Sequence, residues 1–278
     1  MNQDIKNTAG TDAPQKTFAL LASAAQDALV TVRDDLYDFS LLLDAVKLRR
    51  KKQPNSHLRL VDSGALSLAQ IEWLAEEGAD VYTSDEVRKN LQELEHIQDA
   101  CHKGHTLFAY LHNGPLESEE GSSFGLSGLK SLGPNGVYIY LSNKERERDL
   151  SGLMELSDLC RCAGRLVYYH HNDLDPALIG LGREGSWIHL SDSSIKTSDD
   201  GTLLADVIRE ARSAGSGVCL HVEKGADPLL LEDLQKCGAI LIFKSALIDY
   251  RSSLKALEVK ARKHQLKPWS YYLYPIFF

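Results

Sequence analysis

Short β-rich segments alternate with longer amphipathic segments along most of the chain, and this alternation constrains the fold more than any other feature. Nine short segments follow one another: LVTVRD (29–34), LRLVDS (58–63), DVYTSD (80–85), TLFAYLHN (106–113), VYIYLSN (137–143), RLVYYHHN (165–172), SWIHLSD (186–192), GVCLHVEKG (217–225) and AILIFKS (239–245). In the segments between them, such as 67–79 and 86–104, apolar residues recur every three or four positions, as in a helix. Strand–helix–strand alternation with short links is typical of parallel strands joined by right-handed crossovers.

We therefore predict an α/β fold with a parallel (β/α)8 barrel of the TIM type, and an open doubly wound parallel sheet is the alternative. Nine candidate strands are one more than such a barrel needs. From 58–63 onward, short and long crossovers alternate, which suggests four βαβα quarters, with 29–34 either an extra strand or the true first strand. No G-x-G-x-x-G follows an early strand, which disfavours a dinucleotide site, and neither a P-loop nor a G-x-S-x-G motif occurs.

The length of 278 residues suits one large domain of barrel size. Residues 1–16 are polar and without periodicity, so we expect a disordered N-terminal tail. A single barrel domain is expected over 17–265. The segment 266–278 is an aromatic C-terminal tail, expected to pack on the barrel or to join two copies in a homo-oligomer.

Charge and composition restrict the partners. The net charge of −8 disfavours nucleic-acid binding, although the basic segment 47–53 is a local exception. No apolar run is long enough to cross a bilayer and no leader peptide is evident, so we expect a cytoplasmic protein that does not bind membranes. The five cysteines form no C-x-x-C pair and are expected to be reduced thiols.

Alternate residues of a barrel strand point inward while the others face the helices. Placing the aliphatic residues outward leaves an unusually polar inward set: Thr31, Arg33, Arg59, Tyr138, Tyr140, Ser142, Trp187, His189, Ser191, Cys219, His221 and Glu223. Arg33 and Arg59 are candidate substrate-binding residues, expected to pair with carboxylates such as Asp35, Asp62 or Asp80. Tyr140 is a further candidate for substrate binding.

Histidines near the carboxyl ends of four strands suggest a site. His112, His170, His189 and His221 are candidate ligands of a divalent metal such as zinc, manganese or iron. Imidazoles also suit general acid–base catalysis, with Glu223 and Asp62 as candidate catalytic carboxylates. A purely structural polar network is the alternative for all of them.

The segment RLVYYHHNDLDP (165–176) leaves one choice open. Because strand side chains alternate, one member of His170–His171 is expected to reach the cavity beside His189 and His221, and the other to turn away. The doubled tyrosine and histidine ensure that one of each faces inward in either register.

The last strand ends in a different set of candidates. Lys244 could act as a Schiff-base nucleophile if burial lowers its pKa. Ser245 and Arg251 could bind an anion where barrels often bind phosphate.

Three functions are consistent with these patterns. The first is a barrel enzyme acting on a small polar or anionic metabolite, with metal-assisted hydrolase chemistry as one form. The second is a Schiff-base lyase or aldolase that uses Lys244. The third is a non-catalytic barrel that binds a ligand or a partner protein.

Overall fold

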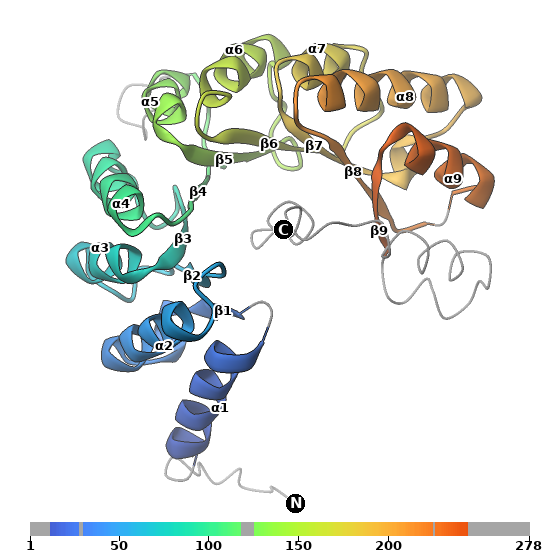
Figure 1. Ribbon diagram of the computed structural model, residues 1–278. Helices are drawn as coiled ribbons and strands as arrows, with labels where there is room; N and C mark the ends of the chain where they lie inside the picture. The colour runs from blue at the N-terminus through green and yellow to red at the C-terminus, as the bar shows by residue number, and fades with distance from the viewer. Residues whose placement is uncertain (1–11, 28–29, 118–124, 225, 244–278) are drawn as a thin grey trace, which may run out of the picture. The chain divides into compact units, whose positions relative to one another are not determined.

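Nine strands and nine α-helices alternate along the part of the chain that the computed structural model describes, namely residues 12–27, 30–117, 125–224 and 226–243 (Figure 1). The strands are β1 (Val30–Arg33), β2 (Leu58–Val61), β3 (Ala79–Ser84), β4 (Phe108–Leu111), β5 (Val137–Ser142), β6 (Arg165–His170), β7 (Trp187–Ser191), β8 (Val218–Val222) and β9 (Ile240–Phe243). Every predicted β-rich segment overlaps one of them, with β3 beginning one residue earlier than predicted, so this part of the prediction is confirmed.

The helices are α1 (Asp12–Gln26), α2 (Phe39–Lys52), α3 (Leu68–Glu77), α4 (Leu91–Gly104), α5 (Leu126–Leu132), α6 (Leu150–Cys160), α7 (Ala177–Arg183), α8 (Ser198–Ser213) and α9 (Pro228–Cys237). Helix α1 starts within the segment expected to be a tail. Residues 1–11 and the aromatic segment 266–278 lie outside the described residues. None of the described helices is both long and apolar enough to cross a bilayer.

The strands are parallel neighbours in chain order from β1 to β9. A doubly wound sheet reverses its direction of winding between two halves. This order never reverses, so the prediction of an α/β fold wound like a TIM-type barrel is confirmed and the doubly wound alternative is wrong. The described residues contain nine strands where a (β/α)8 barrel has eight.

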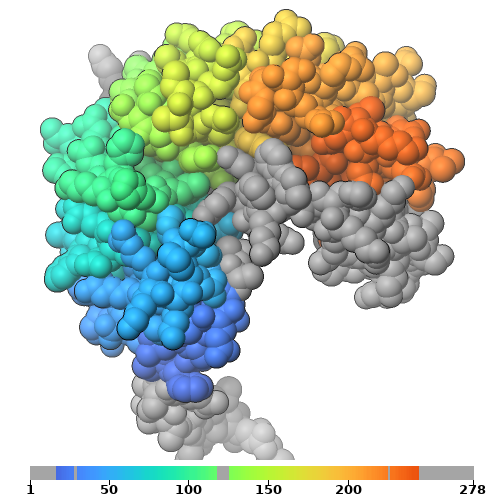
Figure 2. Space-filling model, in the orientation of Figure 1, coloured from blue at the N-terminus to red at the C-terminus, as the bar shows by residue number. Residues whose placement is uncertain are grey.

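The chain divides into two compact units. The first comprises the described residues up to Thr83 together with Gln92–Phe108, and the second comprises Ser84–Leu91 and the described residues from Ala109 onward. In the second unit, α6, α7 and α8 cover one face of the sheet and their side chains form a continuous outer surface (Figures 1 and 2). The aliphatic residues that alternate along β7 and β8, such as Ile188 and Leu220, are fully buried.

A carboxylate or amide follows the end of every other strand and binds the loop after the next strand. We call Asp34, Asp85, Asn143 and Asp192 the strand-end acceptors. The Asp34 carboxylate accepts hydrogen bonds from the backbone N–H groups of Ser63, Ala65 and Leu66, in the loop after β2. The other three follow β3, β5 and β7, and their backbone donors lie after β4, β6 and β8: Asn113 and Gly114 for Asp85, His171 for Asn143, and Glu223, Lys224 and Ala226 for Asp192.

These contacts identify four strand pairs, β1–β2, β3–β4, β5–β6 and β7–β8. The expectation of four βαβα quarters therefore holds with the segment at 29–34 as the true first strand, and β9 lies outside the four pairs. Each loop N–H that a strand-end acceptor binds would otherwise need water or another partner, because a buried backbone donor without an acceptor is costly.

We predict that Asp34→Ala lowers the free energy of unfolding by at least about 3 kcal/mol, because three backbone N–H groups lose their acceptor at about 1–3 kcal/mol each. The neighbouring Asp35→Ala is the matched control. Asp35 forms an exposed ion pair with Arg33, and its loss should cost no more than about 1 kcal/mol. Urea denaturation of both variants measures the difference, and equal losses would contradict the role assigned to Asp34.

Candidate functional site

A pocket of about 530 Å³ lies at the carboxyl ends of β5 to β8, within the second unit. The carboxyl ends of parallel strands are the usual position of ligand sites in α/β proteins. Ser142 from β5, Tyr169 from β6, His189 and Ser191 from β7, and His221 from β8 contribute to its wall.

Strand alternation brings an aromatic ring and two imidazoles together on the pocket face. Tyr169 of β6 pairs in register with His189 of β7, and their rings stack with centroids 4.1 Å apart at an interplanar angle of 21°. Nδ1 of His189 lies 2.9 Å from Nε2 of His221, which comes from β8. The predicted inward faces of β7 and β8 therefore meet as expected.

Burial keeps these imidazoles neutral. It lowers the pKa of His189 well below the ordinary value of 6.5, and the neighbouring His221 lowers it further. Burial also lowers the pKa of His221, against the opposing effect of Glu223. The pKa of His171 is lowered by burial and then by Lys144. Around neutral pH the pocket therefore presents uncharged imidazoles, which accept or donate hydrogen bonds without carrying charge.

Both members of the pair line the pocket, and His171 is the one on the Tyr169 side of the strand. It follows Tyr169 by two residues, and it interacts electrostatically with both Glu223 and His221. The sequence predicts that one member reaches the cavity and the other turns away, whereas both contribute to its wall; the choice of His170 as a metal ligand stays a prediction. The register could not be read from a segment in which both tyrosine and histidine are doubled.

Two hydrogen bonds of the His170 ring anchor the loop after β6. Its Nδ1 accepts a hydrogen bond from the Asn143 amide at 3.3 Å, and its Nε2 donates to the carbonyl of Asp173 at 2.7 Å. Its ring lies 5.9 Å from that of Tyr168, centroid to centroid. These contacts use both ring nitrogens of His170.

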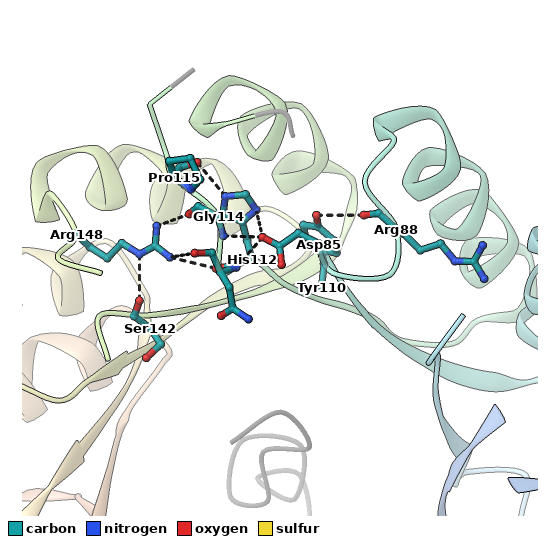
Figure 3. A network of polar contacts seen from close by, with 9 residues as sticks. Asp85, Arg88, Tyr110, His112, Gly114, Pro115, Ser142 and Arg148 are labelled. Atoms are coloured by element: carbon teal, nitrogen blue, oxygen red, sulfur yellow. Dashed lines mark hydrogen bonds and ion pairs between the residues drawn. The ribbon is translucent and has the colours of Figure 1, made fainter. Parts of the chain in front are cut away.

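His112 occupies the corresponding position after β4 (Figure 3). Its Nδ1 lies 3.2 Å from an oxygen of Asp85, and its Nε2 donates to the carbonyl of Pro115 at 3.2 Å. The ring lies 6.2 Å from that of Tyr110, centroid to centroid, which repeats the Tyr168–His170 arrangement. His112 and His170 are therefore equivalent loop-anchoring residues of two successive strand pairs.

The four imidazoles expected to bind a metal thus lie in three different environments, and only His189 and His221 are in contact. Among the described residues, no group of three histidine, cysteine, aspartate or glutamate side chains is placed to hold a metal ion. Metal binding by these histidines therefore stays a prediction, and no step is assigned to a metal.

Three cations line the pocket, and sequence reasoning did not identify them. Lys144, Arg146 and Arg148 are accompanied by two carboxylates, Glu145 and Glu223, which leaves an excess of one positive charge while the imidazoles are neutral. The chain as a whole carries −8. A local positive excess on an acidic protein favours an anionic ligand.

Of the three cations, Arg148 is engaged by backbone carbonyls of the protein itself (Figure 3). Its guanidinium donates to the carbonyls of Ser142 at 3.0 Å, Gly114 at 2.6 Å and Asn113 at 3.1 Å, so it ties the loop after β4 to the end of β5. Burial lowers its pKa, and Arg146 lowers it further. The exposed side chains of Lys144 and Arg146 are left as the groups available to an anion.

The carboxylate of Glu223 lines the pocket and interacts electrostatically with His221 and His171. Its Oε2 accepts a hydrogen bond from the Ser191 hydroxyl at 3.3 Å. The backbone N–H of Glu223 is bound by the strand-end acceptor Asp192. The side chain is therefore directed from an anchored loop into the wall of the pocket.

The remaining predicted residues lie elsewhere. In the first unit, Arg33 forms the expected ion pair with Asp35 at 2.8 Å, but the pair is exposed. Arg59 is buried, 6.0 Å from the ring centroid of Tyr82, and Asp62 accepts a hydrogen bond from the Thr83 hydroxyl at 2.8 Å.

Tyr140 is buried in β5, and its place in the pocket wall is taken by Ser142. Lys244, Ser245 and Arg251 lie outside the described residues. The Schiff-base prediction for Lys244 therefore stays a prediction.

A scan against protein-family models finds no match, and neither does a search of curated proteins. Among solved structures, a citrate synthase variant shows 14% identity over 74% of this chain and 94% of its own, with a TM-score of 0.34. A deoxyribose phosphate aldolase from Aeropyrum pernix shows 13% identity over 87% of this chain and 97% of its own, with a TM-score of 0.31. Likenesses at this level carry no inference about activity, so the chemistry has to be derived from the pocket.

We predict that His170→Ala lowers the free energy of unfolding by about 2 kcal/mol or more, because a buried ring and its two hydrogen bonds are lost. The adjacent His171→Ala removes an exposed side chain and should change stability by no more than about 0.5 kcal/mol. Thermal and urea denaturation measure both. A larger loss for His171→Ala than for His170→Ala would contradict the loop-anchoring role of His170.

Proposed function

We propose that this protein is an enzyme that removes a proton next to the carbonyl group of a small anionic substrate. The observation that carries the proposal is the neutral His189–His221 pair, in contact at 2.9 Å, in a pocket that also contains Glu223 and the exposed cations Lys144 and Arg146. A hydrogen-bond donor, a carboxylate and an anion-binding group are the parts that such a reaction requires.

His221 is the proposed hydrogen-bond donor to the substrate carbonyl. Its Nε2 is engaged with His189, which leaves Nδ1 as the ring nitrogen available to a ligand. A neutral imidazole can polarise a carbonyl through its N–H, and a low pKa keeps it neutral while it does so. As the substrate loses its proton, negative charge develops on the carbonyl oxygen, and this hydrogen bond strengthens.

Glu223 is the proposed base. It accepts the proton from the carbon next to the carbonyl while the bonding electrons move to the oxygen that faces His221. The hydroxyl of Ser191, 3.3 Å from the Glu223 carboxylate, orients it before the reaction. Return of a proton to the same carbon re-forms the carbonyl and completes the exchange.

Lys144 and Arg146 are proposed to bind the carboxylate or phosphate group of the substrate. Both follow β5, in the loop whose position Arg148 fixes through backbone carbonyls. A guanidinium binds planar oxyanions in two-pronged fashion, and an ammonium acts as a point charge. The anion therefore anchors one end of a small molecule while the carbonyl reaches His221.

We predict that the protein exchanges the α-proton of at least one compound in a panel of small keto acids and carbonyl-containing phosphate monoesters. Proton NMR in deuterium oxide follows the loss of the α-proton signal. Glu223→Gln should slow the exchange by about 10²- to 10⁴-fold, because the base is removed while the shape of the side chain is kept. No exchange across the panel, or unchanged exchange by Glu223→Gln, would rule out the proposed reaction.

Arg146→Gln should raise KM for the same compound with a smaller change in kcat, because the anion contact forms before the reaction and persists through it. Arg209→Gln is the matched control. Arg209 is an exposed arginine of α8 that pairs with Asp206, and it is not part of the pocket wall.

A further inference from the structure

His189 is a buried imidazole with one engaged and one unengaged nitrogen. Its side chain is 1% exposed. Nδ1 lies 2.9 Å from His221, whereas Nε2 has no hydrogen-bond partner among the described residues. A buried polar atom without a partner is unfavourable, so its presence in the wall of a pocket calls for an explanation.

The unmet atom indicates which nitrogen carries the proton. A neutral imidazole has one N–H and one bare nitrogen. With the proton on Nε2, His189 would bury an N–H that donates to nothing, which is rare in folded proteins. With the proton on Nδ1, the unmet atom is a bare acceptor nitrogen, and the N–H is satisfied by Nε2 of His221 at 2.9 Å.

With the proton of His189 on Nδ1, the tautomer of His221 is determined as well. Its Nε2 accepts the hydrogen bond from His189, so a neutral His221 must carry its own proton on Nδ1. Burial lowers the pKa of His221, which agrees with a neutral ring. If His221 carried its proton on Nε2, that N–H and the Nδ1–H of His189 would point at each other across 2.9 Å, so this tautomer of His221 is disfavoured.

Tyr169 holds the ring of His189, and with it the Nδ1–H donor, in place. Its ring stacks on that of His189 with centroids 4.1 Å apart, and Tyr169 is itself 4% exposed. The stack restricts rotation of the His189 ring, so Nδ1 continues to face His221. The three side chains come from adjacent strands, which makes the arrangement part of the sheet rather than of a loop.

We propose that His189 is a positioning residue whose Nδ1–H fixes the tautomer of His221, so that His221 presents Nδ1–H to a carbonyl or oxyanion in the pocket. The inference rests on the proposed function for the statement that a substrate oxygen meets His221. The tautomer itself is a property of the free protein and can be measured without any substrate.

The test is a proton–nitrogen-15 correlation spectrum of the histidine side chains in the labelled full-length chain, at about pH 8, where an ordinary imidazole is neutral. We expect Nδ1 of His221 to give the signal of a protonated ring nitrogen and Nε2 that of a bare one. A bare Nδ1 in the wild-type protein overturns the proposal.

Two variants of His189 separate positioning from packing. His189→Phe keeps a ring against Tyr169 but has no N–H, and the proton of His221 should then divide between its two nitrogens. His189→Asn offers an amide N–H near the position of Nδ1 and should restore the wild-type signature. An unchanged His221 spectrum in His189→Phe overturns the proposal; if that variant does not fold, the wild-type and Asn spectra decide, and a bare Nδ1 in either overturns it.

The same variants connect the tautomer to activity. For a compound that exchanges, His189→Phe should lower kcat by about 100-fold with little change in KM, and His189→Asn should recover most of the loss. Equal kcat values for wild type and His189→Phe overturn the positioning role. If no compound exchanges while the wild-type signature is as expected, the proposed reaction fails and the assignment of the tautomer stands.

Discussion

The hydrogen bonds from loop backbone N–H groups to the strand-end acceptors are the interactions on which the candidate site depends. A loop that leaves a parallel strand has donors that no strand neighbour satisfies, and its conformation is open unless something binds them. Asp34, Asp85, Asn143 and Asp192 each supply that acceptor from the end of the preceding strand. The pocket wall is built on three of the loops fixed in this way.

The four strand-end acceptors are not identical: they differ in the side-chain and backbone groups that they contact. Asn143 donates its amide N–H to Nδ1 of His170, which donates from Nε2 to a backbone carbonyl. Asp85 faces the equivalent histidine, His112, with a carboxylate that also binds two backbone N–H groups. Asp192, like Asp34, binds three backbone N–H groups of the loop after the next strand. The same architectural solution thus uses different combinations of side-chain and backbone donors.

Much of the fold could be predicted from the sequence, because the signals were repeated and local. Apolar alternation located every described strand, and placing Ile188 and Leu190 outward correctly put His189 and Ser191 on one face. The doubled residues at 168–171 carry no such signal, since a shift by one position leaves the pattern unchanged. His112 and His170 resembled ligands because several strands carry a histidine near their carboxyl ends; their carbonyl partners, three residues further on, become apparent only when the loop is folded.

The cations of the pocket were missed for another reason. Lys144, Arg146 and Arg148 alternate with glutamates in the segment KERER, and such a segment is usually a solvated loop. The two residues before this segment, Ser142 and Asn143, carry the sequence signal that could have located this strand end. Serine followed by aspartate or asparagine ends β3, β5 and β7, in each case directly after an apolar strand. A repeat this short is visible once the strand pairs are known.

Because the strand-end acceptors bind main-chain atoms, they fix the course of each loop without regard to the side chains that the loop carries. Pocket positions such as Asn113, His171 and Glu223 contribute only their N–H to that contact. Their side chains can therefore be substituted one at a time while the hydrogen bonds that hold the loop backbone are kept. A scaffold of this kind is evolvable: selection can rewrite the chemistry of the pocket at single codons, and a laboratory library confined to these positions would sample new specificities within an intact fold.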